Sequence, residues 1–318
     1  MPVSQNYIIE EQIPQGLRLD RFVSEFMRLL SRSQIKARNL KAKINGKDVK
    51  LSRIVKQGDS LDLSWDLAQP EYITPEDIPL DIVREDERCI VINKPQGMVV
   101  HPGAGNRHGT LANALYFKML NKHTNNIHDN AQPRREINLR PGIVHRLDKE
   151  TSGIIIAAFD DESHAFLSRQ FKDRKVKKKY IAVVCGTPKE KKGRIETFIA
   201  RDARDRKRFT AALQGKHAVT YYKVIKNWKN YSLVMLCPRT GRTHQLRVHM
   251  KYIGNPILGD AVYGHNDKFF PEASLMLHSK SLSITLPGET QESIFSSSMP
   301  ERFTAVIEKL ERTEGAYG

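Results

Sequence analysis

Residues 141–158 have the sequence PGIVHRLDKETSGIIIAA, in which a short polar cluster is followed directly by an apolar run. The run after Gly153 is rich in β-branched residues, and this composition predicts a buried strand. The cluster before it is therefore predicted to form a tight loop at a sheet edge, fixed by a glycine at each end. Asp148 would project from this loop with Arg146 two residues away, and such a carboxylate can act as a base, a nucleophile or a metal ligand. The alternative is an ordinary turn in which Asp148 and Thr151 cap backbone groups.

The chain has 318 residues and a formal net charge of +16 at pH 7. Because the charge is spread along the sequence, it indicates a surface that binds a polyanion and not a charged tail. No apolar segment approaches the roughly 20 residues of a membrane-spanning helix, and the N-terminal residues lack the layout of a signal peptide. We therefore expect a cytoplasmic protein without membrane attachment. Cys89, Cys185 and Cys237 have neither zinc-ribbon spacing nor disulfide density, and each is expected to be a small buried hydrophobe.

The pattern divides the chain into two folded parts. Residues 1–66 predict a small domain with a first helix that buries Leu17, Leu19, Phe22, Val23 and Phe26, a second helix over 32–40 capped by Ser31, and a hairpin that turns at Asn45-Gly46. Residues 67–80 contain three prolines and predict an extended linker. Residues 81–312 form the main domain, and 313–318 are a short tail.

Strands outnumber helices in the main domain, so we expect an α+β fold with a mostly antiparallel mixed sheet and flanking helices. Asp160 or Asp161 caps a helix that contains Leu167 and Phe171. Thr243 is the expected N-cap of a helix over 244–253, and Gly254 stands where that helix ends. Residues 121–136 are polar without an apolar period and predict a surface insertion.

Three segments carry a resemblance to a known family. HRLDKETSG at 145–153 resembles the active-site motif of the RluA/RluD family of RNA pseudouridine synthases, HRLDxxTSG. KPQGMVVHPGAGN at 94–106 is similar to the same family, especially its RluD branch, and GRTHQLRVH at 241–249 resembles its third motif. In the first domain, GLRLDRFV, SRSQIKARN and INGKDV resemble the small S4-type α/β RNA-binding domain. The resemblance spans essentially the whole chain and implies a pseudouridine synthase fold preceded by an S4-type domain.

The resemblance also implies roles for four residues. Asp148 matches the family's nucleophile, which acts at the ribose carbon after ionisation or by glycal formation, and these two routes stay open. Arg247 matches its salt-bridge partner, which would bind the carboxylate through two parallel hydrogen bonds. Tyr180 would stack on the base, and its hydroxyl could help to remove the carbon-bound proton. Arg146 would take the place of the flipped base in the RNA helix.

The family needs neither a cofactor nor a metal, and we expect none here. His244 and His249 are five residues apart, outside the spacing of a helical zinc pair. Phosphate contacts are expected from the basic run at 172–179 and from the first domain. The alternative for the basic helix of that domain is an ordinary solvated face. The candidate RNA-binding residues of the first domain are Arg18, Arg21, Arg32, Lys36, Arg38, Lys41 and Lys43.

The implied function is the isomerisation of specific uridines in large-subunit (23S) ribosomal RNA, in a stem-loop with clustered uridines, by a monomer. One alternative is an RluC-like enzyme that acts on other 23S sites. Another is a non-catalytic RNA-binding or ribosome-assembly factor on an inactive synthase fold. A third, a nucleoside hydrolase or RNA glycosidase, would need an activated water and usually a second acid or a metal.

Overall fold

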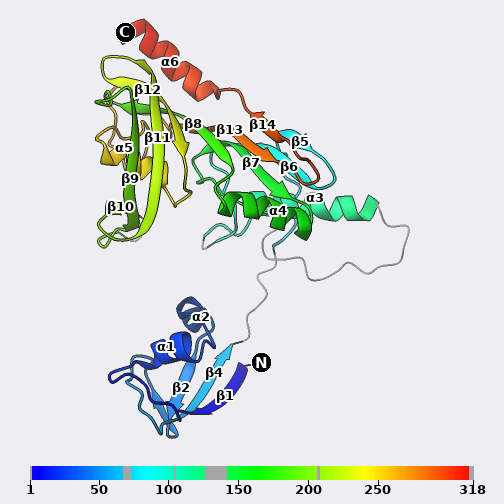
Figure 1. The fold of residues 1–318 in the computed structure, drawn as a ribbon, viewed down its shortest axis with the longest axis vertical. Helices are drawn as coiled ribbons and strands as arrows, with labels where there is room; N and C mark the ends of the chain where they lie inside the picture. The colour runs from blue at the N-terminus through cyan, green and yellow to red at the C-terminus, as the bar shows by residue number, and fades with distance from the viewer. Residues whose placement is uncertain (1, 67–72, 104, 126–141, 206–207, 315–318) are drawn as a thin grey trace. The chain divides into compact units, whose positions relative to one another are not determined.

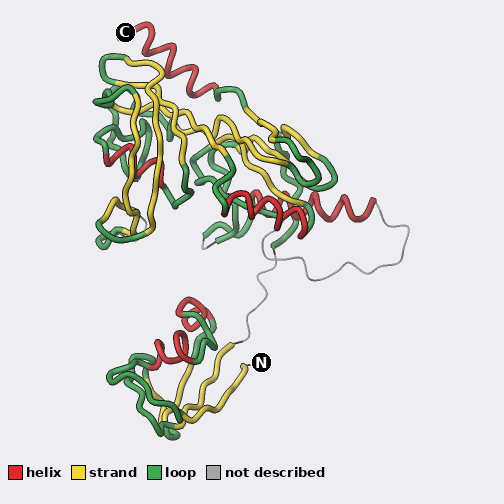
Figure 2. The backbone as a smooth tube through the Cα atoms, viewed as in Figure 1, coloured by secondary structure: helices red, strands yellow, loops and turns green. Residues whose placement is uncertain are grey.

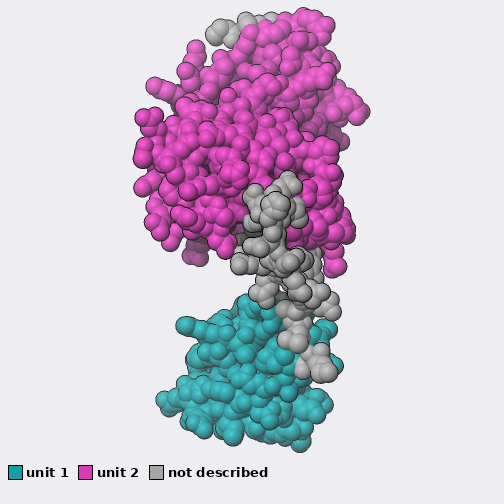
Figure 3. Space-filling view, turned by 90° about the vertical axis from the view of Figure 1, so that its right-hand side faces the viewer, with its two compact units in different colours: residues 1–72 teal, residues 73–318 magenta. Residues whose placement is uncertain are grey.

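The computed structural model describes residues 2–66, 73–103, 105–125, 142–205 and 208–314. Contacts divide the chain into two units, Met1–Tyr72 and Ile73–Gly318 (Figure 3). Ile73 and Leu80 pack against the large hydrophobic core of the second unit, so residues 73–80 of the expected linker belong to that unit by contact. Residues 67–72, the rest of the expected linker, lie outside the described residues. Among the described residues, no helix combines the length and the apolar character needed to cross a membrane.

The first unit packs short helices on a four-stranded antiparallel sheet with the order β1-β4-β2-β3 (Figure 1). Its elements are β1 (Pro2–Ile8), α1 (Leu19–Arg21), the π-helical η1 (Phe22–Phe26), α2 (Arg32–Ala37), β2 (Lys41–Ile44), β3 (Lys47–Val49) and β4 (Ser60–Asp66). Strand β1 had no counterpart in the sequence prediction.

Local signals in the first unit are largely confirmed. Ser31 forms a capping box, because its side chain accepts a hydrogen bond from the Gln34 backbone at 3.3 Å while the Gln34 side chain accepts one from the Ser31 backbone at 2.8 Å. Asn45 and Gly46 both adopt positive φ between β2 and β3, as the hairpin turn requires. Helix α2 ends three residues earlier than expected, because Asn39 adopts a left-handed conformation. The burial of Phe26 was wrongly predicted, since 44% of its surface is exposed.

The second unit is built on one ten-stranded sheet with the order β10-β9-β11-β12-β8-β13-β7-β6-β5, to which β14 adds beside β13. Every pairing is antiparallel except that of β7 with β13. This confirms an α+β fold with a mostly antiparallel mixed sheet, and strands dominate the unit (Figure 2). Its elements are β5 (Ile82–Glu85), β6 (Cys89–Lys94), α3 (Leu111–Asn125), β7 (Ser152–Ala158), α4 (Asp161–Lys172), β8 (Lys177–Cys185), β9 (Lys192–Arg201), β10 (Phe209–Ala212), β11 (Lys216–Asn227), β12 (Tyr231–Pro238), α5 (Gln245–Tyr252), β13 (Leu277–Thr285), β14 (Glu292–Ser296) and α6 (Glu301–Glu314).

Strand β7 is the predicted apolar strand, and all seven of its residues are buried between β6 and β13. Gly153 has φ +109°, and a Cβ atom there would lie 2.2 Å from the Ser279 carbonyl oxygen on β13. Only glycine fits this close parallel approach, so Gly153 fixes the point at which the polar loop becomes a strand.

In the second unit, the predicted N-cap of α4 and the predicted end of α5 are confirmed, but the predicted N-cap of α5 is wrong. Asp160 caps α4, because its carboxylate accepts a hydrogen bond from the Ser163 backbone at 2.7 Å. Thr243 is not the cap of α5: His244 occupies that position in a left-handed conformation, φ 54°, without a side-chain capping bond. The Gln245 side chain accepts the Arg242 backbone N–H at 3.0 Å instead. Gly254, φ +84°, ends this helix as predicted, with its N–H bonded to the Lys251 carbonyl.

Two further expectations are corrected. Residues 121–125 of the expected surface insertion belong to α3, and residues 126–136 lie outside the described residues. Only Cys89 is a fully buried cysteine, because Cys185 and Cys237 are half-buried. All three are free thiols.

Candidate active site

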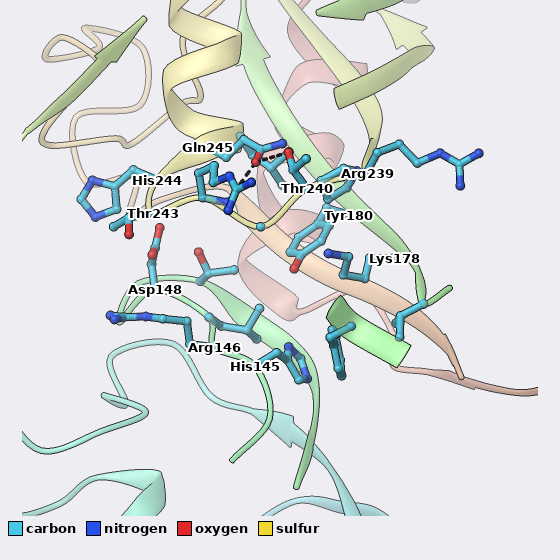
Figure 4. Close-up of a pocket in the computed structure, with 18 of the residues that line it drawn as sticks. His145, Arg146, Asp148, Lys178, Tyr180, Arg239, Thr240, Thr243, His244 and Gln245 are labelled. Carbon is cyan, nitrogen blue, oxygen red and sulfur yellow. Dashed lines mark hydrogen bonds between the residues drawn. The ribbon is translucent and has the colours of Figure 1, made fainter. Parts of the chain in front are cut away.

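The four candidate catalytic residues line one cavity of about 560 Å³ in the second unit. Figure 4 shows Arg146 and Asp148 on the loop before β7, His244 and Thr243 opposite them, and Tyr180 on β8. Arg247 joins the lining from α5. The volume lies within the roughly 300–1,000 Å³ of small-molecule sites. The fold therefore collects residues that are 101 positions apart in the sequence, from 146 to 247.

The loop that carries Asp148 is held by a turn within it and by contacts with β7 and α4. The Thr151 N–H bonds to the Asp148 carbonyl at 3.1 Å and closes the turn. The His145 ring stacks on Phe171 at 4.5 Å between centroids, and its Nε2 accepts the Ile156 backbone N–H at 3.1 Å. Burial lowers the pKa of His145 to about 3, so the ring stays neutral and keeps this acceptor. Such contacts fix the direction in which Asp148 projects.

The KPQG segment at residues 94–97 contacts the same loop. Lys94 is completely buried, and its ammonium donates to the carbonyls of Pro95, Met98 and Lys149 at 2.8, 2.9 and 3.2 Å. The Gly97 N–H also bonds to the Lys149 carbonyl, at 2.9 Å. Lys94 thereby ties its own turn to the residue that follows Asp148. The structure gives this motif a positioning role that its sequence did not specify.

Arg247 pairs with two carboxylates: it lies within ion-pair distance of Asp148, as expected, but its two parallel hydrogen bonds go to Asp260. Its guanidinium makes two parallel hydrogen bonds of 2.7 Å to Asp260, whereas its distance to the Asp148 carboxylate is 3.7 Å. Asp260 has no exposed side-chain surface and also accepts the Val262 and Tyr263 N–H groups at 2.9 Å. Burial alone would raise the pKa of Asp260, but the guanidinium and these two donors hold it below its ordinary value. Asp260 therefore fixes Arg247, and Arg247 faces Asp148 as a preorganised cation.

Tyr180 lies buried beside Asp148 in the cavity lining. Burial, with the Asp148 charge as a lesser cause, raises the pKa of Tyr180 to about 12. The phenol therefore keeps its proton at neutral pH, where it can donate a hydrogen bond or pack against a base but is a poor proton acceptor. Hydrogen-bond donation and packing against the base are therefore the roles that this environment favours for Tyr180.

His244 and Tyr263 complete the wall around Arg247. The His244 Nδ1 lies 2.8 Å from the Tyr263 hydroxyl, and that hydroxyl accepts the Phe209 backbone N–H at 2.9 Å. The Arg247 guanidinium carbon lies 5.0 Å from the centre of the Tyr263 ring, within cation–π distance. Burial lowers the pKa of His244, which favours a neutral ring that accepts the tyrosine proton at Nδ1.

Lys178 also projects into the cavity and was missed as a site residue. It precedes Tyr180 by two positions on β8, so both side chains lie on one face of the strand (Figure 4). Its ammonium makes no hydrogen bond or ion pair with any residue that the structure describes. Burial lowers the pKa of Lys178 to about 8. The Thr151 hydroxyl, also in the lining, is buried without a partner among the described residues. The two-residue spacing of Lys178 and Tyr180 was the sequence signal that could have placed Lys178 in the site, because alternate residues of a strand lie on the same face.

The candidate RNA-binding residues lie in the first unit and divide into two groups. Three are in exposed ion pairs within 3 Å of an acid, Arg18 with Asp20 and both Arg21 and Arg32 with Glu25. The other four form no ion pair with a described residue, namely Lys36, Arg38, Lys41 and Lys43. Exposed ion pairs contribute little to folding stability, so an RNA phosphate can replace Asp20 or Glu25 as the partner of these arginines at little cost. In the second unit the basic run also divides: Lys177 pairs with Glu292 at 2.7 Å, while Lys172, Arg174 and Lys178 line the cavity.

The site thus combines a carboxylate beside a fixed guanidinium, a buried tyrosine on β8 and the HRLDxxTSG loop before β7 of a mixed sheet, as expected of an RNA pseudouridine synthase. The comparisons agree: a family model described as RNA pseudouridylate synthase matches residues 88–252. The chain belongs to this family, whose members isomerise uridine to pseudouridine in RNA.

Relatives extend the similarity over most of the chain. It is 41% identical to the ribosomal large subunit pseudouridine synthase D of Borreliella burgdorferi, over 98% of this chain and 94% of that protein. It is 40% identical to the protein of the same name from Zymomonas mobilis, over 84% and 83% of the two chains. Among solved structures, human RNA pseudouridylate synthase domain containing 4 is 26% identical with a TM-score of 0.56, over 72% of this chain and 92% of that one.

Proposed function

We propose that this protein converts uridines of large-subunit (23S) ribosomal RNA to pseudouridine, in a stem-loop with clustered uridines as in the RluD branch. The relatives named large subunit pseudouridine synthase D, at about 40% identity over most of the chain, support the substrate. The observation that carries the chemistry is the position of Asp148, 3.7 Å from a guanidinium that Asp260 holds fixed, in the cavity that Tyr180 lines.

In the proposed reaction Asp148 acts on the ribose as a carboxylate. It bonds to C1′ as the N1–C1′ bond breaks, or it removes the C2′ proton to form a glycal. The uracil turns in the cavity and C5 bonds to C1′. In the covalent route the C1′–O bond to Asp148 breaks as this bond forms, and in the glycal route Asp148 returns the proton to C2′. C5 loses its proton and N1 gains one, so every atom of the substrate is retained. No redox change accompanies the reaction.

Lys178 and Tyr180 are suited to the leaving base. Heterolysis of the N1–C1′ bond leaves negative charge on the uracil, spread over its ring and carbonyl oxygens. The Lys178 ammonium, which pairs with no described residue, can stabilise such charge, because the attraction in a partly buried site is stronger than in water. The Tyr180 phenol, which keeps its proton, can donate to the same anion.

RNA binding completes the proposal. Arg146 is exposed at the mouth of the cavity and would fill the space left by the extruded uridine. The first unit, as an S4-type domain, would hold phosphates through its unpaired basic residues. We also propose that the protein acts as a monomer, as the family resemblance implies, and in the cytoplasm, where the proposed substrate would be.

Pseudouridine mapping of large-subunit RNA from cells with and without this gene tests the function. Carbodiimide-dependent reverse-transcription stops should disappear from one clustered stem-loop, and return with the wild-type gene but not with Asp148→Ala. Loss at scattered single sites would favour the RluC-like alternative. Unchanged stops throughout the large-subunit RNA would refute the proposed substrate, and full rescue by Asp148→Ala would refute the role of Asp148.

A further inference from the structure

A second group of reactive side chains lies at the far end of β8, outside the catalytic cavity. Cys185 is the last residue of that strand, and His265 and Asp267 lie on the loop that leads to β13. The ligand atoms of these three residues lie within 4.8 Å of one another. Among the residues with described positions, no other three or more histidine, cysteine and acidic side chains meet this condition. We propose that Cys185, His265 and Asp267 form a binding site for Zn²⁺.

The Asp267 carboxylate is oriented before any metal binds. Its Oδ1 accepts the backbone N–H groups of Phe269 and Phe270, both at 2.9 Å. The Tyr231 hydroxyl lies 2.8 and 2.9 Å from the two carboxylate oxygens. These bonds hold Asp267 with Oδ2 toward the Cys185 sulfur, 3.9 Å away. Hydrogen bonds of this kind orient the ligands of metal sites and raise their affinity.

The thiol and the histidine complete a mixed donor set. Cys185 is a free, half-buried thiol. A metal ion bound there would replace the thiol proton, because the thiolate is the form that binds metals. His265 is exposed and leaves a path from solvent to the other two ligands.

The donors select the class of metal. One sulfur, one imidazole nitrogen and one carboxylate oxygen suit Zn²⁺, which binds four ligands tetrahedrally and can take water as the fourth. Mg²⁺ and Ca²⁺ prefer all-oxygen ligands and would bind weakly here. Sequence spacing did not indicate the site, because 80 positions separate Cys185 from His265 and only the fold brings them together.

A metal bound at this site would link two elements that support the active site. The loop that carries His265 and Asp267 begins just after Asp260, the partner of Arg247, and Cys185 ends the strand that carries Tyr180. A bond network through the metal would join these two supports. Binding should therefore stabilise the folded protein, because Zn²⁺ would bind the native state and not an assembled site in the unfolded chain.

Cobalt binding to the full-length protein tests the site. Co²⁺ should produce a thiolate-to-metal charge-transfer band that Zn²⁺ removes by competition. Cys185→Ser should abolish the band, whereas Cys237→Ser, at the other half-buried free thiol, should leave it unchanged. Tyr231→Phe should weaken Zn²⁺ binding about 10–100-fold through loss of the hydrogen bond to Asp267.

A second variant keeps the test decisive if Cys185→Ser does not fold. His265→Gln changes an exposed side chain, and it should remove the rise in thermal midpoint that Zn²⁺ gives the wild type. Absence of a charge-transfer band in the wild-type protein would overturn the proposal. So would a band that survives Cys185→Ser, or a Zn²⁺-dependent midpoint that is equal in the wild type and His265→Gln. None of these results depends on catalytic activity.

Discussion

Asp260→Asn tests the conclusion that a buried carboxylate, which is not itself facing the substrate, holds the active site together. The variant keeps the shape of the side chain but removes the charge that faces the Arg247 guanidinium. Its amide group would also face hydrogen-bond donors, because Val262 and Tyr263 donate to the same side chain. Breaking a buried ion pair by removing one partner costs about 3–5 kcal/mol. For a domain of this size, that loss lowers the thermal midpoint by roughly 6–20 °C.

The catalytic effect should exceed what reduced stability explains. In Asp260→Asn only one side-chain oxygen remains to accept, so the Arg247 guanidinium loses at least one of its two short hydrogen bonds and can move from its place 3.7 Å from Asp148. A displacement of about 1 Å in a catalytic group can cost about 100-fold in rate. Single-turnover rates, measured well below the midpoint of the variant, should therefore fall about 100-fold while RNA affinity stays within a few-fold of the wild type.

The matched control is Glu292→Gln, which removes an exposed ion pair with Lys177 and should change stability by less than about 1 kcal/mol. The pH dependence gives a further check. The pKa of Asp260 is lower in the folded state than in the unfolded chain, so its contribution is complete above the unfolded value of about 4 and is lost as the pH falls through the folded value. An Asp260→Asn protein with the midpoint and the turnover rate of the wild type would refute this account of the site.

Three further predictions concern the cavity, the central strand and the first unit. Wild-type turnover should decline as the pH rises through about 8, where Lys178 loses its charge. Lys178→Arg should remove this decline, and Lys178→Met should lower the rate about 100-fold at neutral pH. A pH–rate profile that is the same in Lys178→Arg and the wild type would exclude the proposed role of Lys178. Gly153→Ala should lower the free energy of unfolding in urea by about 2 kcal/mol or more, because its Cβ would meet the Ser279 carbonyl at 2.2 Å. The control Gly46→Ala, with open space at its Cβ, should lower it by about 1 kcal/mol. Equal losses in the two variants would contradict the packing argument. Lys41→Glu with Lys43→Glu should weaken RNA binding and reduce its salt dependence without slowing single-turnover chemistry, and an unaltered salt slope would show that these side chains do not contact phosphate.

Patterns with a short range in the sequence predicted the structure well. The β-branched run after Gly153 became the buried strand β7, the serine at position 31 became a capping box, and the Asn45-Gly46 pair became the hairpin turn. Each of these depends on contacts within a few residues, or on burial that composition alone indicates. Strand β1 was missed because its pairing partner, β4, lies more than 50 residues away.

The site was predicted only in part, because some of its contacts join residues that have no regular spacing in the sequence. The motif identified Asp148 and Arg247 as neighbours, and the structure brings them within 3.7 Å. It could not show that Asp260 takes both strong hydrogen bonds of Arg247, because a carboxylate 13 positions away on a loop has no periodic relation to the helix. Thr243 was wrongly predicted as a helix cap because its residue type suits that position, but tertiary contacts place His244 there in a left-handed conformation.

The parallel pairing of β7 with β13 has a consequence for how the protein is synthesised. Strand β7 begins at Ser152, directly after the catalytic loop, yet the β13 residues that pair with its first two positions, His278 and Ser279, follow more than 100 residues later. A nascent chain must therefore expose this apolar edge during the translation of more than 100 residues, and unpaired edges of this kind are templates for aggregation. Truncation before β13 would keep Asp148, Tyr180 and Arg247, but it would leave the first residues of β7 without their pairing partner.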